Sequence, residues 1–165
     1  MVSENNSQYD VIVIGAGVAG LYQLFKLRQL KLKVLVIEAG DNVGGTWYWN
    51  RYPGARFDSE SWSYGYSFSK ELFEEWDWPE HFAAQPDTLR YLNYVADKFD
   101  LRRDIKFGRR VEASVFDQEN NLWTVRTNTK EEYVASFLIT ALGPLSAFTL
   151  PNIEGRETFK GPAYH

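Results

Sequence analysis

The fold is decided by the stretch Tyr9-Asp10-Val11-Ile12-Val13-Ile14-Gly15-Ala16-Gly17-Val18-Ala19-Gly20. Its first six residues form a mainly β-branched run that ends in glycine, which predicts a buried parallel strand. From Val18 to Leu30 apolar residues recur at helical spacing, and Lys33 to Ile37 repeats the strand pattern. Such a βαβ unit of about thirty residues has a right-handed crossover and parallel strands. The sequence therefore predicts an α/β fold with a Rossmann-like dinucleotide-binding domain.

The glycines of this stretch predict a site for a diphosphate. Gly15, Gly17 and Gly20 match G-x-G-x-x-G, in which the glycines permit a tight turn, close approach of a pyrophosphate, and helix–strand packing. The N–H groups and the dipole at the helix N-terminus attract the phosphates. Glu38 ends the second strand eighteen positions beyond Gly20, where it can accept hydrogen bonds from an adenosine ribose. The alternative is a plain turn with a solvated glutamate. The fingerprint leaves FAD and NAD(P) open, although a carboxylate at Glu38 disfavours a 2′-phosphate.

Composition excludes several classes of function. The chain has 165 residues, enough for one domain or one lobe of a larger enzyme, and a net charge of -4, which argues against a nucleic-acid partner. It has no cysteine and two histidines, so we expect no disulfide, no thiolate and no metal site. Residues 1–8 are polar and read as a flexible leader without the build of a secretion signal. No apolar run is long enough to span a membrane, and we expect a cytoplasmic protein.

The remaining chain predicts one long loop, one helix and a small sheet. Residues 41–69 have no sustained periodicity but are rich in aromatic residues, which is typical of a functional loop. A helix is expected after Pro86. Alternating strands around 111–115 and 123–127, followed by a strand at 133–142, predict an antiparallel meander whose last strand re-enters the main sheet. Trp62, Trp76 and Trp78 are interpreted as packing residues.

The segment after Glu38 resembles a known family. Gly45-Thr46-Trp47-Tyr48-Trp49-Asn50-Arg51-Tyr52-Pro53-Gly54-Ala55-Arg56-Phe57-Asp58 is similar to the FAD domain of Baeyer–Villiger monooxygenases of the cyclohexanone and phenylacetone monooxygenase type. The likeness continues through Glu60-Ser61, Tyr64-Gly65-Tyr66-Ser67-Phe68, Gln85-Pro86, Leu89-Arg90-Tyr91 and residues 140–146. The last residues, 159–165, resemble the opening of the family's F-x-G-x-x-x-H-[T/S]-x-x-W fingerprint. Heteroatom-oxidising flavin monooxygenases share much of this pattern, and the Trp-Tyr-Trp and Tyr-Pro-Gly-Ala-Arg blocks favour the Baeyer–Villiger branch.

The resemblance, together with the glycine fingerprint, implies a set of cofactor-binding residues. They are Gly15, Gly17, Ala19, Gly20, Glu38, Gly45, Thr46, Trp47, Tyr48, Trp49, Arg56, Phe57, Asp58, Ser59, Tyr64, Val111 and Pro144. Pro144 would contribute backbone atoms only, and Val111 is equally well explained as plain core. Asp58 is the expected catalytic residue, because the family's aspartate in this block pairs with a catalytic arginine of the NADPH domain. The alternative for Asp58 is a turn or cap aspartate.

The resemblance also implies a reaction and a domain plan. Residues 9–150 would be the first segment of an FAD-binding domain, and residues 151–165 a linker toward an NADP-binding domain outside this chain. The cofactors would be FAD and NADPH, with NADPH bound mainly by residues outside the chain. The whole enzyme would use O₂ to convert a small ketone into an ester or lactone. The chain alone, without the NADP-binding and second FAD segments, is expected to be inactive. The alternatives are a heteroatom-oxidising flavin monooxygenase, a non-catalytic flavin-binding fragment and a plain NAD dehydrogenase.

Overall fold

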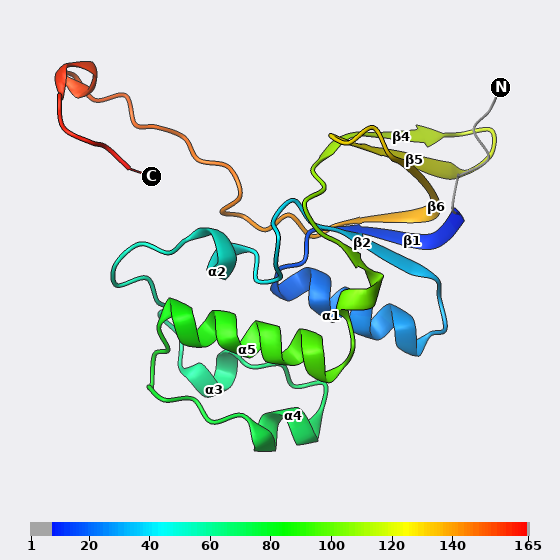
Figure 1. The fold of residues 1–165 in the computed structure, drawn as a ribbon, viewed down its shortest axis with the longest axis horizontal. Coiled ribbons are helices and arrows are strands. Elements are labelled where there is room, and N and C mark those ends of the chain that lie inside the picture. Colours follow the sequence, from blue (N-terminus) through cyan, green and yellow to red (C-terminus); the bar gives the residue numbers. More distant parts are fainter. Residues whose placement is uncertain (1–7, 165) are drawn as a thin grey trace.

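The computed structural model describes residues 8–164, which form one six-stranded sheet with helices against it (Figure 1). β1 (Gln8–Ile14) pairs in parallel with β2 (Val34–Ile37) and with β6 (Glu132–Thr140), and β2 pairs in parallel with β3 (Ile105–Lys106). β4 (Val111–Asp117) and β5 (Leu122–Thr127) complete the order β3-β2-β1-β6-β5-β4 through antiparallel pairs. The predicted α/β class, the parallel βαβ unit and the meander that re-enters the sheet through β6 are confirmed.

Two hydrophobic cores lie on the two faces of the sheet. Alternate residues of a strand point to opposite faces, and in β1 Val11 and Val13 face the larger core while Ile12 faces the smaller one. The larger core is closed by α1 (Val18–Gln29) and α5 (Gln85–Lys98), which lie on the same side of the sheet in Figure 1. The smaller core is closed by Val125, Tyr133 and Ala135 of the meander, which curls back over the parallel strands.

The prediction of an unbroken loop over residues 41–69 is wrong. This segment contains α2 (Thr46–Trp49) and α3 (Ser61–Tyr64), and α4 (Lys70–Glu75) follows it. Helices of one turn are too short to show a 3.6-residue repeat, and tertiary contacts hold them. β3 was missed because two residues carry no alternation. The expected leader includes Gln8, which instead begins β1, while residues 1–7 and His165 lie outside the described residues.

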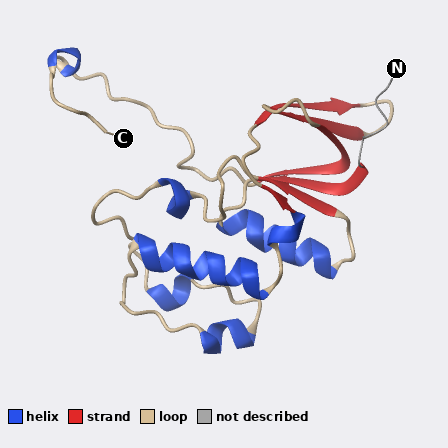
Figure 2. Cartoon of the chain, in the orientation of Figure 1, coloured by secondary structure: helices blue, strands red, loops and turns tan. Residues whose placement is uncertain are grey.

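The C-terminal segment leaves the body of the domain. After β6 the chain runs outward with a single 3₁₀ turn, η2 (Arg156–Thr158), as Figure 2 shows. Residues 142–164 are exposed throughout, including several large apolar side chains such as Leu145, Ile153 and Phe159. Among residues 8–164, no helix has the length and apolar character needed to cross a membrane.

Candidate dinucleotide site

The glycine turn joins β1 to α1 at the carboxyl edge of the parallel strands. Gly15 has φ +103°, and a Cβ there would lie 2.6 Å from the carbonyl oxygen of Ala141. A Cβ on Gly20 would lie 1.9 Å from the carbonyl oxygen of Gly15, so a side chain at either position would collide with backbone. Gly17 is the N-cap of α1, and no side chain caps it. The first N–H groups of α1 are therefore free of side-chain acceptors, as an anion site at a helix N-terminus requires.

A second glycine segment packs directly on this turn. The Gly44 N–H donates to the Ala16 carbonyl at 3.0 Å. Gly45 has φ +53°, and a Cβ there would lie 2.8 Å from the Cα of Gly17. A Cβ on Gly17 would in turn lie 3.4 Å from the Cα of Gly45, an ordinary contact. The two loops thus meet as bare backbone. We call the pair, residues 15–20 and 44–45, the glycine cradle.

Glu38 connects β2 to the glycine cradle. Its carboxylate is buried and accepts the Ala16 N–H at 2.6 Å through Oε2 and the Gly40 N–H at 2.7 Å through Oε1. Sequence reasoning expected a ribose acceptor and missed this structural role, for which no sequence signal exists beyond the position of the acid. Each carboxylate oxygen can accept more than one hydrogen bond, so Glu38 can still accept a hydrogen bond from a ligand hydroxyl.

The short helix α2 begins at the cradle and carries four aromatic or polar side chains into different surroundings. Trp47 is buried and donates its Nε1–H to the Tyr64 hydroxyl at 2.7 Å. Thr46 and Tyr48 are half-buried, whereas Trp49 is exposed. The Tyr48 ring lies against Gly40, where a Cβ would come within 2.7 Å of it. Tyr48 and Trp49 are therefore accessible near the cradle, while the Trp47 indole belongs to the core.

Phe57 and Tyr64 pack against the ring of Trp47. Their rings stack with centroids 4.2 Å apart and an interplanar angle of 9°, and the Trp47 ring meets both edge-on. Burial raises the pKa of the Tyr64 hydroxyl, although the hydrogen bond from Trp47 opposes this shift. The structure thus gives Phe57 and Tyr64 packing roles. Gln85 was missed by sequence reasoning; its side-chain amide donates to the Trp47 carbonyl and fixes α2 to α5.

Arg56 and Asp58 point away from this core. Arg56 pairs with Glu80 at 2.9 Å and donates to the Phe82 carbonyl at 3.0 Å, so its guanidinium is engaged by the neighbouring loop. Asp58 is exposed and makes no hydrogen bond or ion pair with any residue between 8 and 164, and Ser59 beside it is half-buried. A carboxylate without a partner among these residues is accessible to an incoming cation.

Of the other expected site residues, Ala19 belongs to the glycine cradle, whereas Val111 and Pro144 lie outside its two loops. Ala19 is exposed in the first turn of α1. Val111 is half-buried against the smaller core, two residues after Arg109, whose N–H donates to the Glu38 carbonyl at 2.8 Å. Pro144 is exposed, three residues after Ala141, whose N–H donates to the Ile14 carbonyl. The missed residue Tyr66 donates its hydroxyl to the Val18 carbonyl at 2.6 Å and so braces α1.

The fold and this cradle define the class: a dinucleotide-binding α/β domain of the kind found in flavoprotein oxidoreductases. The family model "Pyridine nucleotide-disulphide oxidoreductase" matches residues 12–165. The chain belongs to this family.

The proteins of known activity that this chain resembles are monooxygenases. The chain is 51% identical over 156 residues to 2-oxo-Delta(3)-4,5,5-trimethylcyclopentenylacetyl-CoA monooxygenase of Pseudomonas putida, covering 94% of the chain and 29% of that protein. It is 45% identical to phenazine N-monooxygenase PhzNO1 of Lysobacter antibioticus (100% and 31%), and 44% identical to a Baeyer-Villiger monooxygenase of Pseudooceanicola batsensis (96% and 29%). The solved structure "OTEMO complex with FAD and NADP (form 3)" superposes with a TM-score of 0.87 at 50% identity, covering 95% of the chain and 30% of that structure.

These likenesses confirm the predicted resemblance to the amino-terminal part of Baeyer–Villiger monooxygenases. The chain spans only 29 to 31% of the length of these curated relatives. The activities of these whole proteins can therefore be assigned to this chain only as a proposal.

Proposed function

We propose that this chain is the FAD-binding part of an NADPH- and O₂-dependent flavin monooxygenase that converts a small ketone into an ester or lactone. The observation that carries the proposal is the glycine cradle, in which two loops expose bare backbone at a helix N-terminus with no side-chain cap. The kinship with Baeyer–Villiger monooxygenases and with a structure solved with FAD and NADP supports the same conclusion.

The cradle fits the diphosphate of FAD by its chemistry. Free N–H groups at the start of α1 are donors for phosphate oxygens, and the helix dipole favours the negative charge. A side chain on Gly17 would occupy the space through which phosphate approaches the backbone. Glu38, held at the end of β2 by two backbone N–H groups, keeps acceptor capacity for ribose hydroxyls. Tyr48 and Trp49 supply accessible aromatic surface beside the cradle.

Bound FAD supplies the electron transfer and the oxygen chemistry, and the chain's residues bind and orient it. The hydrogen bond from the Ala16 N–H to Glu38 holds the cradle in place before the ligand binds, which reduces the entropic cost of binding. Asp58, without a partner among the described residues, would hold an arginine of the NADP-binding portion in a bidentate ion pair. We further propose that Val111 and the backbone at Pro144 border the flavin and that residues 151–165 lead to the NADP-binding portion.

The binding step is tested by replacing Gly17 with alanine. The fold should tolerate this methyl group, because its nearest atom would be the Cα of Gly45 at 3.4 Å. The methyl group would nevertheless obstruct the diphosphate, so we expect the Kd for FAD to rise at least about tenfold, equivalent to about 1.4 kcal/mol. FAD titration followed by flavin fluorescence, and the flavin absorbance band at about 450 nm in the purified protein, measure this.

Ser67→Ala is the matched control, since Ser67 is exposed and makes no side-chain hydrogen bond among the described residues. Its affinity for FAD should equal that of the unmodified chain. A folded chain that binds no FAD, or a Gly17→Ala variant that binds it with unchanged affinity, would contradict the proposed role of the cradle.

A second candidate is oxidation of a heteroatom instead of a ketone. The 45% identity to phenazine N-monooxygenase PhzNO1 over the whole chain favours it. The two candidates share the FAD site and differ in the substrate. Product analysis of a protein that joins this chain to an NADP-binding portion, with NADPH, O₂ and either a cyclic ketone or an aromatic N-heterocycle, separates them. A lactone product supports the leading proposal, whereas an N-oxide alone supports the second.

A further inference from the structure

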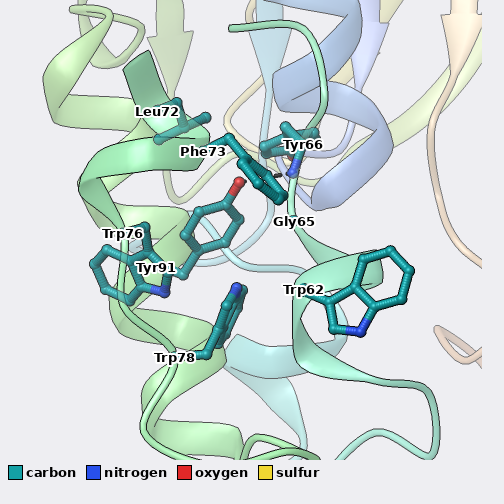
Figure 3. A pocket seen from close by; sticks show the side chains of 8 residues that line it. All are labelled: Trp62, Gly65, Tyr66, Leu72, Phe73, Trp76, Trp78 and Tyr91. Atoms are coloured by element: carbon teal, nitrogen blue, oxygen red, sulfur yellow. Dashed lines mark hydrogen bonds between the residues drawn. The ribbon is translucent and has the colours of Figure 1, made fainter. Parts of the chain in front are cut away.

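A cavity outside the glycine cradle lies among α3, α4 and α5 (Figure 3). Its volume is about 190 Å³, and its walls are mainly the aromatic rings of Trp62, Phe73, Trp76, Trp78 and Tyr91, with Gly65 at one side. None of the residues expected at the FAD site lines it. We call it the aromatic cavity. A cavity of about 150 Å³ with apolar walls is large enough to hold benzene, so this one has room for a single ring with a small substituent.

The polar atoms of the aromatic cavity are unused hydrogen-bond donors. The Trp76 Nε1–H is buried without an acceptor, and the Trp78 Nε1–H has none among residues 8–164. In Figure 3 the indole nitrogen of Trp76 and that of Trp78 each lie on the side of the ring that faces Tyr91. Burial raises the pKa of Tyr91 to about 12, so its hydroxyl stays protonated. That hydroxyl accepts the Tyr66 N–H at 2.7 Å, and its own proton has no acceptor in the described part of the chain.

The walls carry no charge that would select an ion. Among residues 8–164, no acidic or basic side chain lines the cavity. The Trp78 N–H presents the positive edge of its ring at the point beside Gly65, which disfavours a cationic group there. The Arg90 guanidinium lies over the Trp76 ring but pairs with Asp87 at 2.8 Å, so an anion in the cavity would find no free cation there. The chemistry of the walls therefore selects a neutral molecule that brings an acceptor, because a buried N–H without a partner is costly.

Two of the donors converge on one point beside Gly65. A methyl group placed on Gly65 would lie 3.5 Å from the Tyr91 hydroxyl oxygen and 3.8 Å from the Trp78 Nε1. A single ligand atom near that position can thus reach both groups with small adjustments. The mouth of the cavity is formed by exposed rings, since Trp62 is 63% and Phe73 is 54% exposed. A ring inserted between them would cover apolar surface while its acceptor reaches inward.

We propose that the aromatic cavity is a binding site for a neutral single-ring molecule bearing a carbonyl oxygen, distinct from the FAD site. The ring packs against Trp62 and Phe73, and the oxygen accepts hydrogen bonds from the Trp78 Nε1–H and the Tyr91 hydroxyl. This inference does not depend on the proposed monooxygenase function, because none of the residues expected at the FAD site lines the cavity.

Two probes of the same shape test the need for an acceptor. Acetophenone carries a carbonyl group, and α-methylstyrene replaces its oxygen with a CH₂ group. Each is titrated into the ¹⁵N-labelled chain, and the indole N–H resonances of Trp76 and Trp78, assigned from Trp76→Phe and Trp78→Phe, are followed. We expect acetophenone to shift these resonances and to bind about fivefold more tightly than α-methylstyrene, as one net hydrogen bond implies.

Gly65→Ala tests the location without disturbing the fold. Gly65 has φ -67° and ψ 154°, which alanine adopts readily, and the added methyl group makes only ordinary contacts. We expect at least about a tenfold loss of affinity for both probes, because the methyl group takes the place of the ligand atom. Ser67→Ala, two residues away and outside the cavity, should leave both affinities unchanged.

The proposal is overturned by any of three results. These are the absence of a saturable shift at either indole, equal affinities for the two probes, or unchanged binding by Gly65→Ala. FAD titration of the same Gly65→Ala sample keeps the two sites apart. A variant that loses the probes but binds FAD normally supports a separate site, whereas parallel loss of both ligands contradicts it.

Discussion

The glycine cradle and the aromatic lobe, by which we mean Phe57, Tyr64, Tyr66, Trp76, Trp78 and Tyr91, are specified in opposite ways. In the cradle, backbone meets backbone, and added Cβ atoms at Gly20 and Gly45 would come within 1.9 and 2.8 Å of other atoms. In the aromatic lobe, ring centroids lie 4.2 to 5.9 Å apart in stacked, tilted and edge-on pairs, and the Tyr66 and Tyr91 hydroxyls bind backbone atoms. The cradle thus requires glycines, because it has no space for side chains. The lobe instead requires directional contacts between large side chains.

Gly20→Ala should give the largest effect, because it breaks the cradle at its tightest point. The new Cβ would fall 1.9 Å from the Gly15 carbonyl oxygen, which is backbone and cannot turn aside. Helix and strand must separate, and we expect the free energy of unfolding to fall by about 3 kcal/mol or more. Urea denaturation followed by circular dichroism measures the loss.

Gly17→Ala serves as the control for that experiment, since its added methyl group meets nothing closer than 3.4 Å. Its loss of stability should be about 1 kcal/mol or less, the scale of a changed N-cap. Equal destabilisation by the two substitutions would show that helix capping, and not close packing, makes the cradle sensitive.

Tyr64→Phe should have an intermediate effect, because it removes one directional contact from the aromatic lobe and keeps the ring. The Trp47 Nε1–H loses its acceptor, while the stacking of ring 64 on Phe57 is retained. An unsatisfied buried donor costs about 1 to 2 kcal/mol. Thermal or urea unfolding measures the loss. Tyr52→Phe, at an exposed tyrosine, should change stability little, and a similar loss in both variants would remove the argument for the Trp47–Tyr64 hydrogen bond.

This contrast explains what the sequence could and could not predict. The strand, turn and helix around Gly15–Gly20 were predictable because local periodicity and glycine spacing encode them directly. The position of Glu38 was predictable for the same reason, but its hydrogen bonds to Ala16 and Gly40 were not, because they depend on how two loops meet in space. The roles of Gln85 and Tyr66 were missed because their partners, the Trp47 and Val18 carbonyls, are backbone atoms far away in sequence.

The aromatic lobe was the least predictable region. The one-turn helix α3, which carries Tyr64, shows no repeat, and composition alone could not say which tryptophans are buried. Trp76 and Trp78 pack edge-on and tilted against Tyr91, as expected of packing residues. Trp62 is 63% exposed, so the interpretation of that residue as packing is wrong. Directional ring contacts of this kind depend on the tertiary arrangement, which no short spacing in the sequence records.

Glu75→Gln should give the smallest change in stability, and it tests whether charge matters at the rim of the aromatic lobe. The Glu75 carboxylate joins α4 to α5 by accepting from Lys98 at 2.5 Å and from the Tyr94 hydroxyl at 2.6 Å. The hydrogen bond from Lys98, and then that from Tyr94, hold the pKa of Glu75 below its usual value. A carboxyl group with a lowered pKa in the folded state stabilises above the unfolded value of 4.5, and this contribution is lost as the pH falls below it.

The stability difference between the unmodified chain and Glu75→Gln should therefore be present at pH 6 and shrink as the pH falls toward 3. Urea midpoints measured across this range detect it, and the difference at pH 6 should also shrink in high salt because the ion pair is exposed to solvent. A difference that stays constant with pH would mean that Glu75 acts through packing on Tyr94 and not through its charge. In that case the rim of the aromatic lobe would follow the same rule as its interior, in which shape and direction matter and charge does not.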